Sequence, residues 1–166
     1  MNSYHLKTAT ARVLYALWIG LMTILRRRVL GAKAVVINDK NGKVLLVRHS
    51  YKGKSKWYLP GGAVECDEAP IDTIKRELAE ELRLIAKDET LVGIYTGQKN
   101  SLTFLFVCKA LYDIRNFTSM QLEIEEVSFF PIKRLPEDIA PGVKRRIDDA
   151  TAFLVQNKKQ ITWGRW

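Results

Sequence analysis

The sequence predicts an α/β (α+β) fold, a single domain of mixed strands and helices with an extra apolar helix at the amino terminus. The chain has 166 residues, 47% of them hydrophobic, which is enough for one core and too little for two typical domains. Short β-branched runs alternate with two well-separated segments of helical periodicity. We therefore expect a domain over residues 31–160, an extension over 1–30 and a tail over 161–166.

Residues 13–25 of the extension are almost wholly apolar, and basic residues flank them: Arg12, Arg26, Arg27 and Arg28. The run is shorter than the roughly 18 residues that span a bilayer, and no signal-peptide cleavage site follows it. We favour a helix packed against the domain or against a second subunit, as in a homodimer. The alternative is a helix lying in a membrane interface, which the lack of a distinct polar face disfavours.

The first strands are expected over residues 32–37 and 44–48, which are apolar and β-branched. The sequence between them, Asn38 to Gly42, is typical of a hairpin turn. A short strand over 57–59 then leads into Pro60, Gly61 and Gly62. Glycines at this point allow the backbone to come close to a ligand.

A central helix follows, because apolar residues recur at helical spacing and predict one buried face: Ile71, Ile74, Leu78, Leu82 and Ile85. With that face inward, Glu77, Glu80 and Glu81 fall on neighbouring turns. Such like charges destabilise a helix by about 0.2–0.5 kcal/mol per pair unless a cation lies between them. Clustered carboxylate oxygens suit Mg²⁺ or Mn²⁺.

The remaining elements are three strands and a helix. We expect strands over 91–96 and 102–112, with a turn near 98–100, and another over 127–131. A last helix is expected over 143–156, after Pro141 and Gly142.

The stretch from Gly61 to Leu84 resembles the signature of the Nudix hydrolases. That signature runs Gly, five residues, Glu, seven residues, Arg-Glu-aliphatic, one residue, Glu-Glu, one residue, Gly-aliphatic, and the matching residues are Gly62, Glu68, Arg76, Glu77, Leu78, Glu80, Glu81 and Leu84. Arg83 replaces the usual Gly at the helix end, and Asp67 replaces another common Gly. We therefore expect a changed helix exit with the chemistry retained. A solvated acidic helix face would explain neither the glycine pair nor the seven-residue gap.

The resemblance implies an α/β/α sandwich with a mixed central sheet. It also implies divalent-metal-dependent hydrolysis of a phosphoanhydride bond in a nucleoside diphosphate linked to another group, by water attack on phosphorus. By position, the metal ligands are Glu77, Glu80, Glu81 and the Gly61 carbonyl, and Glu77 or Glu80 also orients or deprotonates the water. Arg76 is expected to support catalysis by pairing with Glu68 and holding the Gly62 loop against the helix, the alternative being a plain surface ion pair.

A further catalytic acid is expected beyond the signature, among Glu123, Glu125 and Glu126. We favour Glu123 from its distance to Phe129 and Phe130. The alternative for each is a solvated charge at the end of a strand.

The formal net charge of +9, from 27 Lys and Arg against 18 Asp and Glu, favours polyanionic partners. We expect a small nucleotide substrate, and RNA only if it is capped or 5′-phosphorylated. Arg48, Lys56 and Trp57 are weak candidates for substrate binding, because a solvated loop and core packing are the commoner roles of such residues. The downstream residues that mark the ADP-ribose and diadenosine polyphosphate subfamilies are absent near Asn100.

Cys66 and Cys108 have neither metal nor redox spacing, which indicates reduced thiols and a cytoplasmic location. A different function is also open, a Nudix-fold module that binds a nucleotide or RNA without cutting it. Retention of every acidic position of the signature argues against that alternative.

Overall fold

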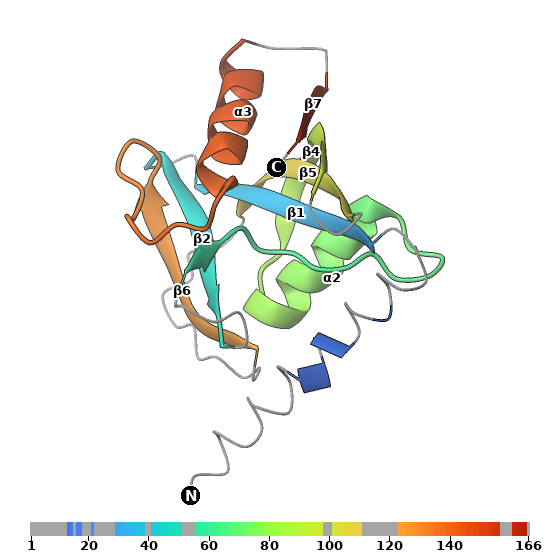
Figure 1. Cartoon of the computed structure of the whole chain (residues 1–166). Coiled ribbons are helices and arrows are strands. Elements are labelled where there is room, and N and C mark those ends of the chain that lie inside the picture. The colour runs from blue at the N-terminus through green and yellow to red at the C-terminus, as the bar shows by residue number, and fades with distance from the viewer. Residues whose placement is uncertain are drawn as a thin grey trace, which may run out of the picture.

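The structure is a computed structural model, and it describes residues 13, 14, 16, 17, 21, 29–38, 41–50, 56–97, 101–110, 123–156 and 161–165. A twisted sheet lies at its centre, with helix α2 (Pro70–Leu82) on one side and helix α3 (Val143–Val155) on the other (Figure 1). This is the α/β/α arrangement that the resemblance to the Nudix hydrolases implies.

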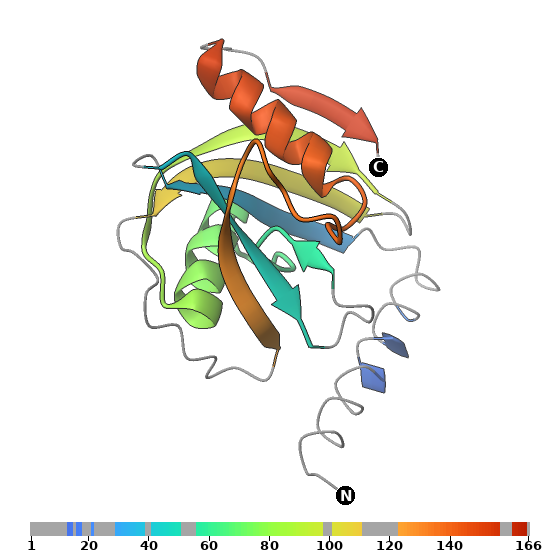
Figure 2. The same cartoon turned by 90° about the vertical axis from the view of Figure 1, so that its left-hand side faces the viewer.

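Within the described residues, the sheet contains seven strands. They are β1 (Val29–Asn38), β2 (Lys43–His49), β3 (Trp57–Tyr58), β4 (Ala86–Thr96), β5 (Ser101–Ala110), β6 (Ile124–Pro131) and β7 (Thr162–Arg165). Their order is β3-β2-β1-β5-β4-β7, and β6 pairs with β2 (Figure 2). The pairs β1 with β5 and β4 with β7 are parallel and the others antiparallel, so the sheet is mixed.

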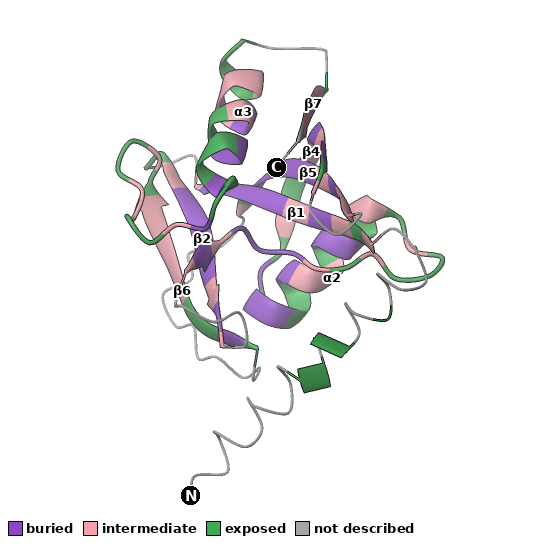
Figure 3. Ribbon diagram, viewed as in Figure 1, coloured by how far each residue is buried: buried purple, intermediate pink, exposed green. Residues whose placement is uncertain are grey.

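Alternate residues of β1 pack on opposite faces of the sheet, as expected for a strand that is buried on both sides. Val35 and Ile37 join the cluster that includes Ile147 of α3. Ala34 and Val36 join the cluster that includes Leu78 of α2. The buried parts of the strands and of both helices accordingly face one another across two cores (Figure 3).

The predicted strands and helices are present, with extended bounds for several strands. β1 begins at Val29 and β4 at Ala86, earlier than the apolar runs themselves. The added end of β4 is polar and is held by pairing with β5, where Lys87 faces Lys109. The β1–β2 hairpin is confirmed by the pairing of Ile37 with Val44. The predicted turn at 98–100 and residues 111–112 lie outside the described residues.

The segment that we assigned to a carboxy-terminal tail forms strand β7, parallel to β4. The ring of Tyr95 in β4 fits against glycine on this strand, since a Cβ at Gly164 would lie 2.8 Å from Tyr95 Cδ1. The Tyr95 hydroxyl donates a hydrogen bond to Asp149 of α3 at 2.6 Å. The tail is thus part of the domain, through a long-range pairing that local sequence patterns do not reveal.

Helix α2 ends one turn earlier than its predicted apolar face. Ile85 lies beyond the helix and is 57% exposed, whereas Leu84 is buried in its place. Arg83 adopts the left-handed conformation, with φ 50°, and the amides of Arg83 and Leu84 donate to the carbonyls of Ala79 and Leu78. The exit therefore keeps the conformation that Gly would favour, and the change that we expected there is not present.

The described part of the amino-terminal segment does not pack against the domain as we expected. Val13, Leu14, Ala16, Leu17 and Leu21 are helical and exposed, and the four larger side chains have exposed fractions of 52–64%. Within the described residues, we find no helix with the length and apolar character needed to cross a membrane. The neighbouring arginines 26–28 lie outside the described residues.

Candidate active site

The loop before α2 lies directly against strand β1. The amide of Ala32 donates to the Gly62 carbonyl and that of Ala34 to the Pro60 carbonyl, both at 3.0 Å. Gly61 has φ +114°, and a Cβ there would lie 2.3 Å from the Ala32 carbonyl oxygen. Only glycine fits at this position, because both the backbone conformation and the space exclude a side chain.

Gly62 brings the same loop into contact with α2. A Cβ at Gly62 would lie 2.1 Å from Oε1 of Glu77. The Glu77 carboxylate therefore occupies the space that a side chain would fill. As a result, a helix carboxylate lies against the loop that carries the Gly61 carbonyl.

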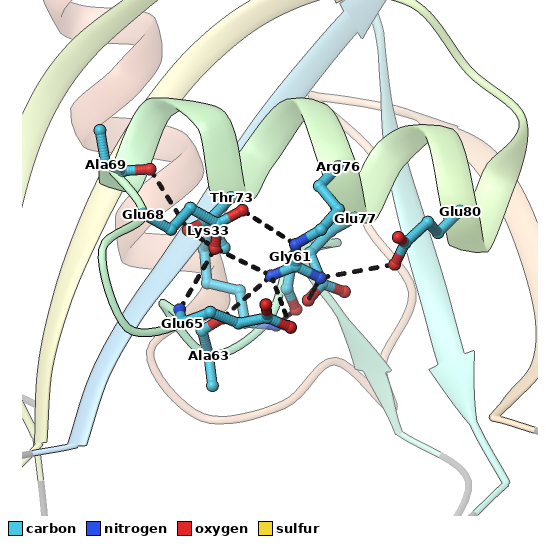
Figure 4. A network of polar contacts seen from close by, with 10 residues as sticks. All are labelled: Lys33, Gly61, Ala63, Glu65, Glu68, Ala69, Thr73, Arg76, Glu77 and Glu80. Atoms are coloured by element: carbon cyan, nitrogen blue, oxygen red, sulfur yellow. Dashed lines mark hydrogen bonds and ion pairs between the residues drawn. The ribbon is translucent and has the colours of Figure 1, made fainter.

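Arg76 forms a bidentate ion pair with Glu68, and the sequence predicts this pairing (Figure 4). Arg76 Nε donates to one carboxylate oxygen at 2.9 Å and Nη2 to the other at 3.0 Å. These bonds lower the pKa of Glu68 to about 2 and raise the pKa of Arg76. Both groups are consequently charged across the physiological pH range.

Glu68 is also held by its own loop and by α2. The buried Thr73 donates its hydroxyl to Glu68 Oε2 at 2.8 Å, and the Glu65 amide donates at 3.2 Å. Arg76 Nη2 reaches the Ala63 carbonyl at 3.3 Å. This network fixes the loop to the helix, so Arg76 is more than a plain surface ion pair.

Arg76 also contacts two of the predicted metal ligands. Its Nη1 donates to Glu77 Oε1 at 2.9 Å and to Glu80 Oε2 at 3.4 Å. The Glu77 side chain is only 14% exposed, and burial raises the pKa of its carboxyl although Arg76 and Lys33 oppose that rise. Arg76 and Lys33 therefore favour the ionised form of the Glu77 carboxyl.

Glu80 and Glu81 differ in their surroundings. The Glu80 side chain is 56% exposed, whereas Glu81 is buried. In this conformation, the described part of the chain contains no group of three His, Cys, Asp or Glu side chains that holds a metal ion.

The donor atoms nevertheless suit Mg²⁺ or Mn²⁺ in type, because carboxylate and carbonyl oxygens are the ligands that these cations prefer. They also suit a cation by position. The Gly61 carbonyl already accepts from the ammonium of Lys33, and Glu77 fills the space beside the loop.

Lys33 was not among our predicted site residues. Its Nζ donates a hydrogen bond to the Gly61 carbonyl across 28 residues of sequence. A signal was available, because Lys33 is the only charged residue within the strand from Val29 to Asn38.

Two of the weak substrate-binding candidates make structural contacts. The Arg48 guanidinium pairs with Glu126 at 2.7 Å and Asp138 at 2.5 Å, and it lies 4.4 Å from the centre of the Trp57 ring. Trp57 is 3% exposed and packs edge-on against Phe130. Core packing, the commoner role, therefore accounts for Trp57. Lys56 is half-buried just before β3, and residues 51–55 lie outside the described part.

Glu123 lies in an exposed turn before β6, and its backbone carbonyl accepts from the Ser50 amide at 3.0 Å. Arg76 contacts acidic side chains of the signature, but Glu123 is not among its described contacts. Glu126 is engaged by Arg48, and Glu125 is exposed. Glu123 therefore stays a prediction.

The cysteines are both free. Cys66 is exposed in the signature loop, and Cys108 is buried in β5, where burial raises its pKa to about 12. Cys108 is thus an unreactive core residue.

Comparison with known proteins agrees with this fold. The model of the NUDIX domain matches residues 27–150. An ADP-ribose pyrophosphatase from Methanocaldococcus jannaschii is 30% identical over 107 residues, which cover 61% of this chain and 62% of that protein. A MutT-like protein from Streptomyces ambofaciens is 30% identical over 118 residues, 70% of this chain and 73% of that protein.

A solved structure of a NUDIX hydrolase from Nitrosomonas europaea has a TM-score of 0.68 at 22% identity, covering 84% of this chain and 80% of that one. The match of the family model to residues 27–150 shows that this chain belongs to the Nudix family. It spans less than two thirds of the length of the archaeal relative, at 62%.

Proposed function

We propose that the protein hydrolyses a phosphoanhydride bond in a nucleoside diphosphate linked to another group, with Mg²⁺ or Mn²⁺ as cofactor. The placement of Glu77 against the loop of Gly61 and Gly62, held by the Arg76–Glu68 pair, is the observation that carries this proposal. The name of the Methanocaldococcus jannaschii relative, an ADP-ribose pyrophosphatase, supports the reaction class.

We assign the roles of the residues by their positions in the Nudix signature. Glu77, Glu80, Glu81 and the Gly61 carbonyl would hold the cation, which supplies polarisation of phosphoryl oxygens and a bound water of lowered pKa. Glu77 and Glu80 are the candidates for orienting the attacking water and taking its proton. Arg76 and Glu68 position this set without touching the reacting atoms. The net charge of +9 favours approach of a polyanionic substrate.

The test is turnover of a substrate panel with Mg²⁺ or Mn²⁺, read as phosphate release after coupled phosphatase treatment. The panel contains nucleotide sugars including ADP-ribose, dinucleotides, nucleoside triphosphates and capped RNA. Glu81→Gln and Glu80→Gln are each expected to lower kcat/KM by about 10²-fold or more, because a metal ligand contributes several kcal/mol to the transition state.

The control is Glu137→Gln, which removes an exposed carboxylate outside the site and is expected to leave the rate unchanged. Circular dichroism verifies folding of each variant. Absence of turnover across the panel, or unchanged rates in both site variants, would overturn the proposal. Saturable nucleotide or RNA binding without turnover would instead support the non-catalytic module.

A second property is favoured by the exposed apolar residues Val13, Leu14, Leu17 and Leu21, which lie at helical spacing. The sequence of residues 1–28 contains five Lys and Arg residues and no Asp or Glu. We propose that this apolar and cationic segment attaches the protein to an anionic membrane surface.

A further inference from the structure

The positively charged ammonium of Lys33 lies beside two of the groups that would hold the metal cation in the proposed function. Lys33 belongs to β1, and its Nζ donates a hydrogen bond to the Gly61 carbonyl. Figure 4 shows Lys33, Gly61 and Glu77 within one polar network. Nothing in the reaction described above assigns a role to this lysine.

The same ammonium acts on Glu77. Burial raises the pKa of the Glu77 carboxyl, and the charge of Lys33 acts in the opposite direction and lowers it. Lys33 therefore interacts with two of the groups that would hold the metal, one carbonyl and one carboxylate. The other cation at this point, Arg76, faces Glu77 and Glu80 from the helix side.

A carbonyl oxygen has two lone pairs, so the competition between an ammonium and a metal ion is not for a single acceptor position. The ammonium opposes metal binding because both groups are positively charged. Two cations a few ångströms apart in a partly buried site repel each other, and this repulsion is much larger there than in water.

We propose that Lys33 is a positioning residue whose ammonium, held at the Gly61 carbonyl and beside Glu77, opposes binding of the divalent cation there by charge repulsion, so that metal binding requires the ammonium to withdraw. The inference rests on the proposed function, because it takes these two groups as metal ligands. It has two consequences. Lys33 holds the glycine loop in shape before metal binds, and it weakens metal affinity below what the carboxylates alone would give.

The experiment measures Mn²⁺ affinity directly, by loss of the electron paramagnetic resonance signal of free Mn²⁺ as the full-length protein is titrated. Three variants separate charge from hydrogen bonding. Lys33→Met removes both, Lys33→Gln keeps an amide donor without the charge, and Lys33→Arg keeps the charge. We expect Lys33→Met and Lys33→Gln to bind Mn²⁺ about tenfold more tightly than the wild type, and Lys33→Arg to stay close to it.

Unchanged or weaker Mn²⁺ binding by the two neutral variants would overturn the inference. Circular dichroism in the presence of EDTA checks folding, and if Lys33→Met does not fold, the comparison of Lys33→Gln with Lys33→Arg decides. The proposed function fails separately, since a wild type without saturable Mn²⁺ binding would remove the metal site itself. Wild-type binding with equal affinity in all variants would remove only the competition.

Discussion

Arg76 contacts four carboxylates at once, and its single positive charge cannot neutralise all four. Two of the partners are closely paired, Glu68 at 2.9 Å and Glu77 at 2.9 Å, and two lie farther away, Glu80 at 3.4 Å and Glu65 at 3.8 Å. One guanidinium leaves an excess of negative charge among four acids. That excess is the electrostatic condition that favours a divalent cation beside them.

Glu68→Gln is the residue-scale test of the loop support. The folded-state pKa of Glu68 is lowered from 4.5 to about 2, so its ionisation stabilises the fold above pH 4.5 and this contribution is lost as the pH falls toward 2. We expect the variant to be less stable at pH 7 by about 1–2 kcal/mol, allowing for solvent screening at the rim of the site. Urea unfolding at several pH values measures the difference, which should narrow as the pH falls.

The matched control is Glu65→Gln, because Glu65 faces the same arginine with a side chain that is 68% exposed. A pair so exposed contributes little, and we expect no measurable change in stability. A stability gap between wild type and Glu68→Gln that stayed constant down to pH 3 would contradict the assigned pKa shift.

At this scale the sequence predicted Arg76 and Glu68 because the signature places them together. It did not predict Lys33, whose partner lies 28 residues away on a different element. Spacing within one helix determines which side chains are neighbours. Contacts between a strand and a distant loop depend on sheet register, which spacing alone does not give.

At the scale of elements, both positions where the family usually has Gly carry another residue in the left-handed conformation. Asp67 has φ 64° and Arg83 has φ 50°. The left-handed conformation costs an L-residue about 1–2 kcal/mol, and Asp tolerates it better than most. The chain therefore keeps the backbone geometry of glycine at an energetic cost, chiefly at Arg83.

Arg83→Gly is expected to raise the free energy of unfolding by about 0.5–1 kcal/mol, the relief of strain less the extra entropy of glycine in the unfolded chain. Urea unfolding measures this change. Arg83→Ala removes the same side chain without relieving the backbone, so it separates the two effects. Equal stabilisation by Arg83→Ala, or destabilisation by Arg83→Gly, would show that the arginine side chain and not its φ controls the helix exit.

The elements themselves were well predicted, because strand alternation and helical periodicity are local signals. α3 ends at Val155, within one residue of its predicted end. The errors lie at polar strand ends and at Ile85, which continues the helical period after the helix has stopped. Tertiary pairing and the turn at Arg83, not hydrophobic pattern, decide those boundaries.

At the scale of the whole molecule, attachment to an anionic surface is tested by flotation with phosphatidylglycerol vesicles. The full-length protein is expected to float with them at low salt and less with neutral phosphatidylcholine vesicles, because both apolar area and charge contribute to binding. Replacing Leu14, Leu17 and Leu21 together by Asn should leave the protein unbound. The leucines are exposed, so the change should not unfold the domain.

Leu154→Asn with Val155→Asn is the control, since both are exposed apolar residues outside the segment. We expect this pair of changes to leave flotation intact. Flotation that persists in the triple variant, or is absent in the wild type, would remove the membrane assignment. A triple variant that changes only the oligomeric mass would show that a second copy of the chain covers the segment.

The overall sandwich followed from the family resemblance, whereas the strand order did not follow from local pattern. The parallel pairs β1 with β5 and β4 with β7 join segments far apart in the chain. Alternation in Val35 to Ile37 shows that β1 is buried on both faces but not which strands lie beside it.

Strand β7 has a consequence for how the protein is made. It covers the end of the outer edge of β4, from Gly93 to Thr96, yet it is synthesised only after β5, β6 and α3. During translation, the nascent chain therefore carries an open sheet edge at β4 until the ribosome has released residues 162–165. An open edge can pair with other chains, so ribosome pausing between α3 and β7 would lengthen the period in which this protein is vulnerable to misassembly.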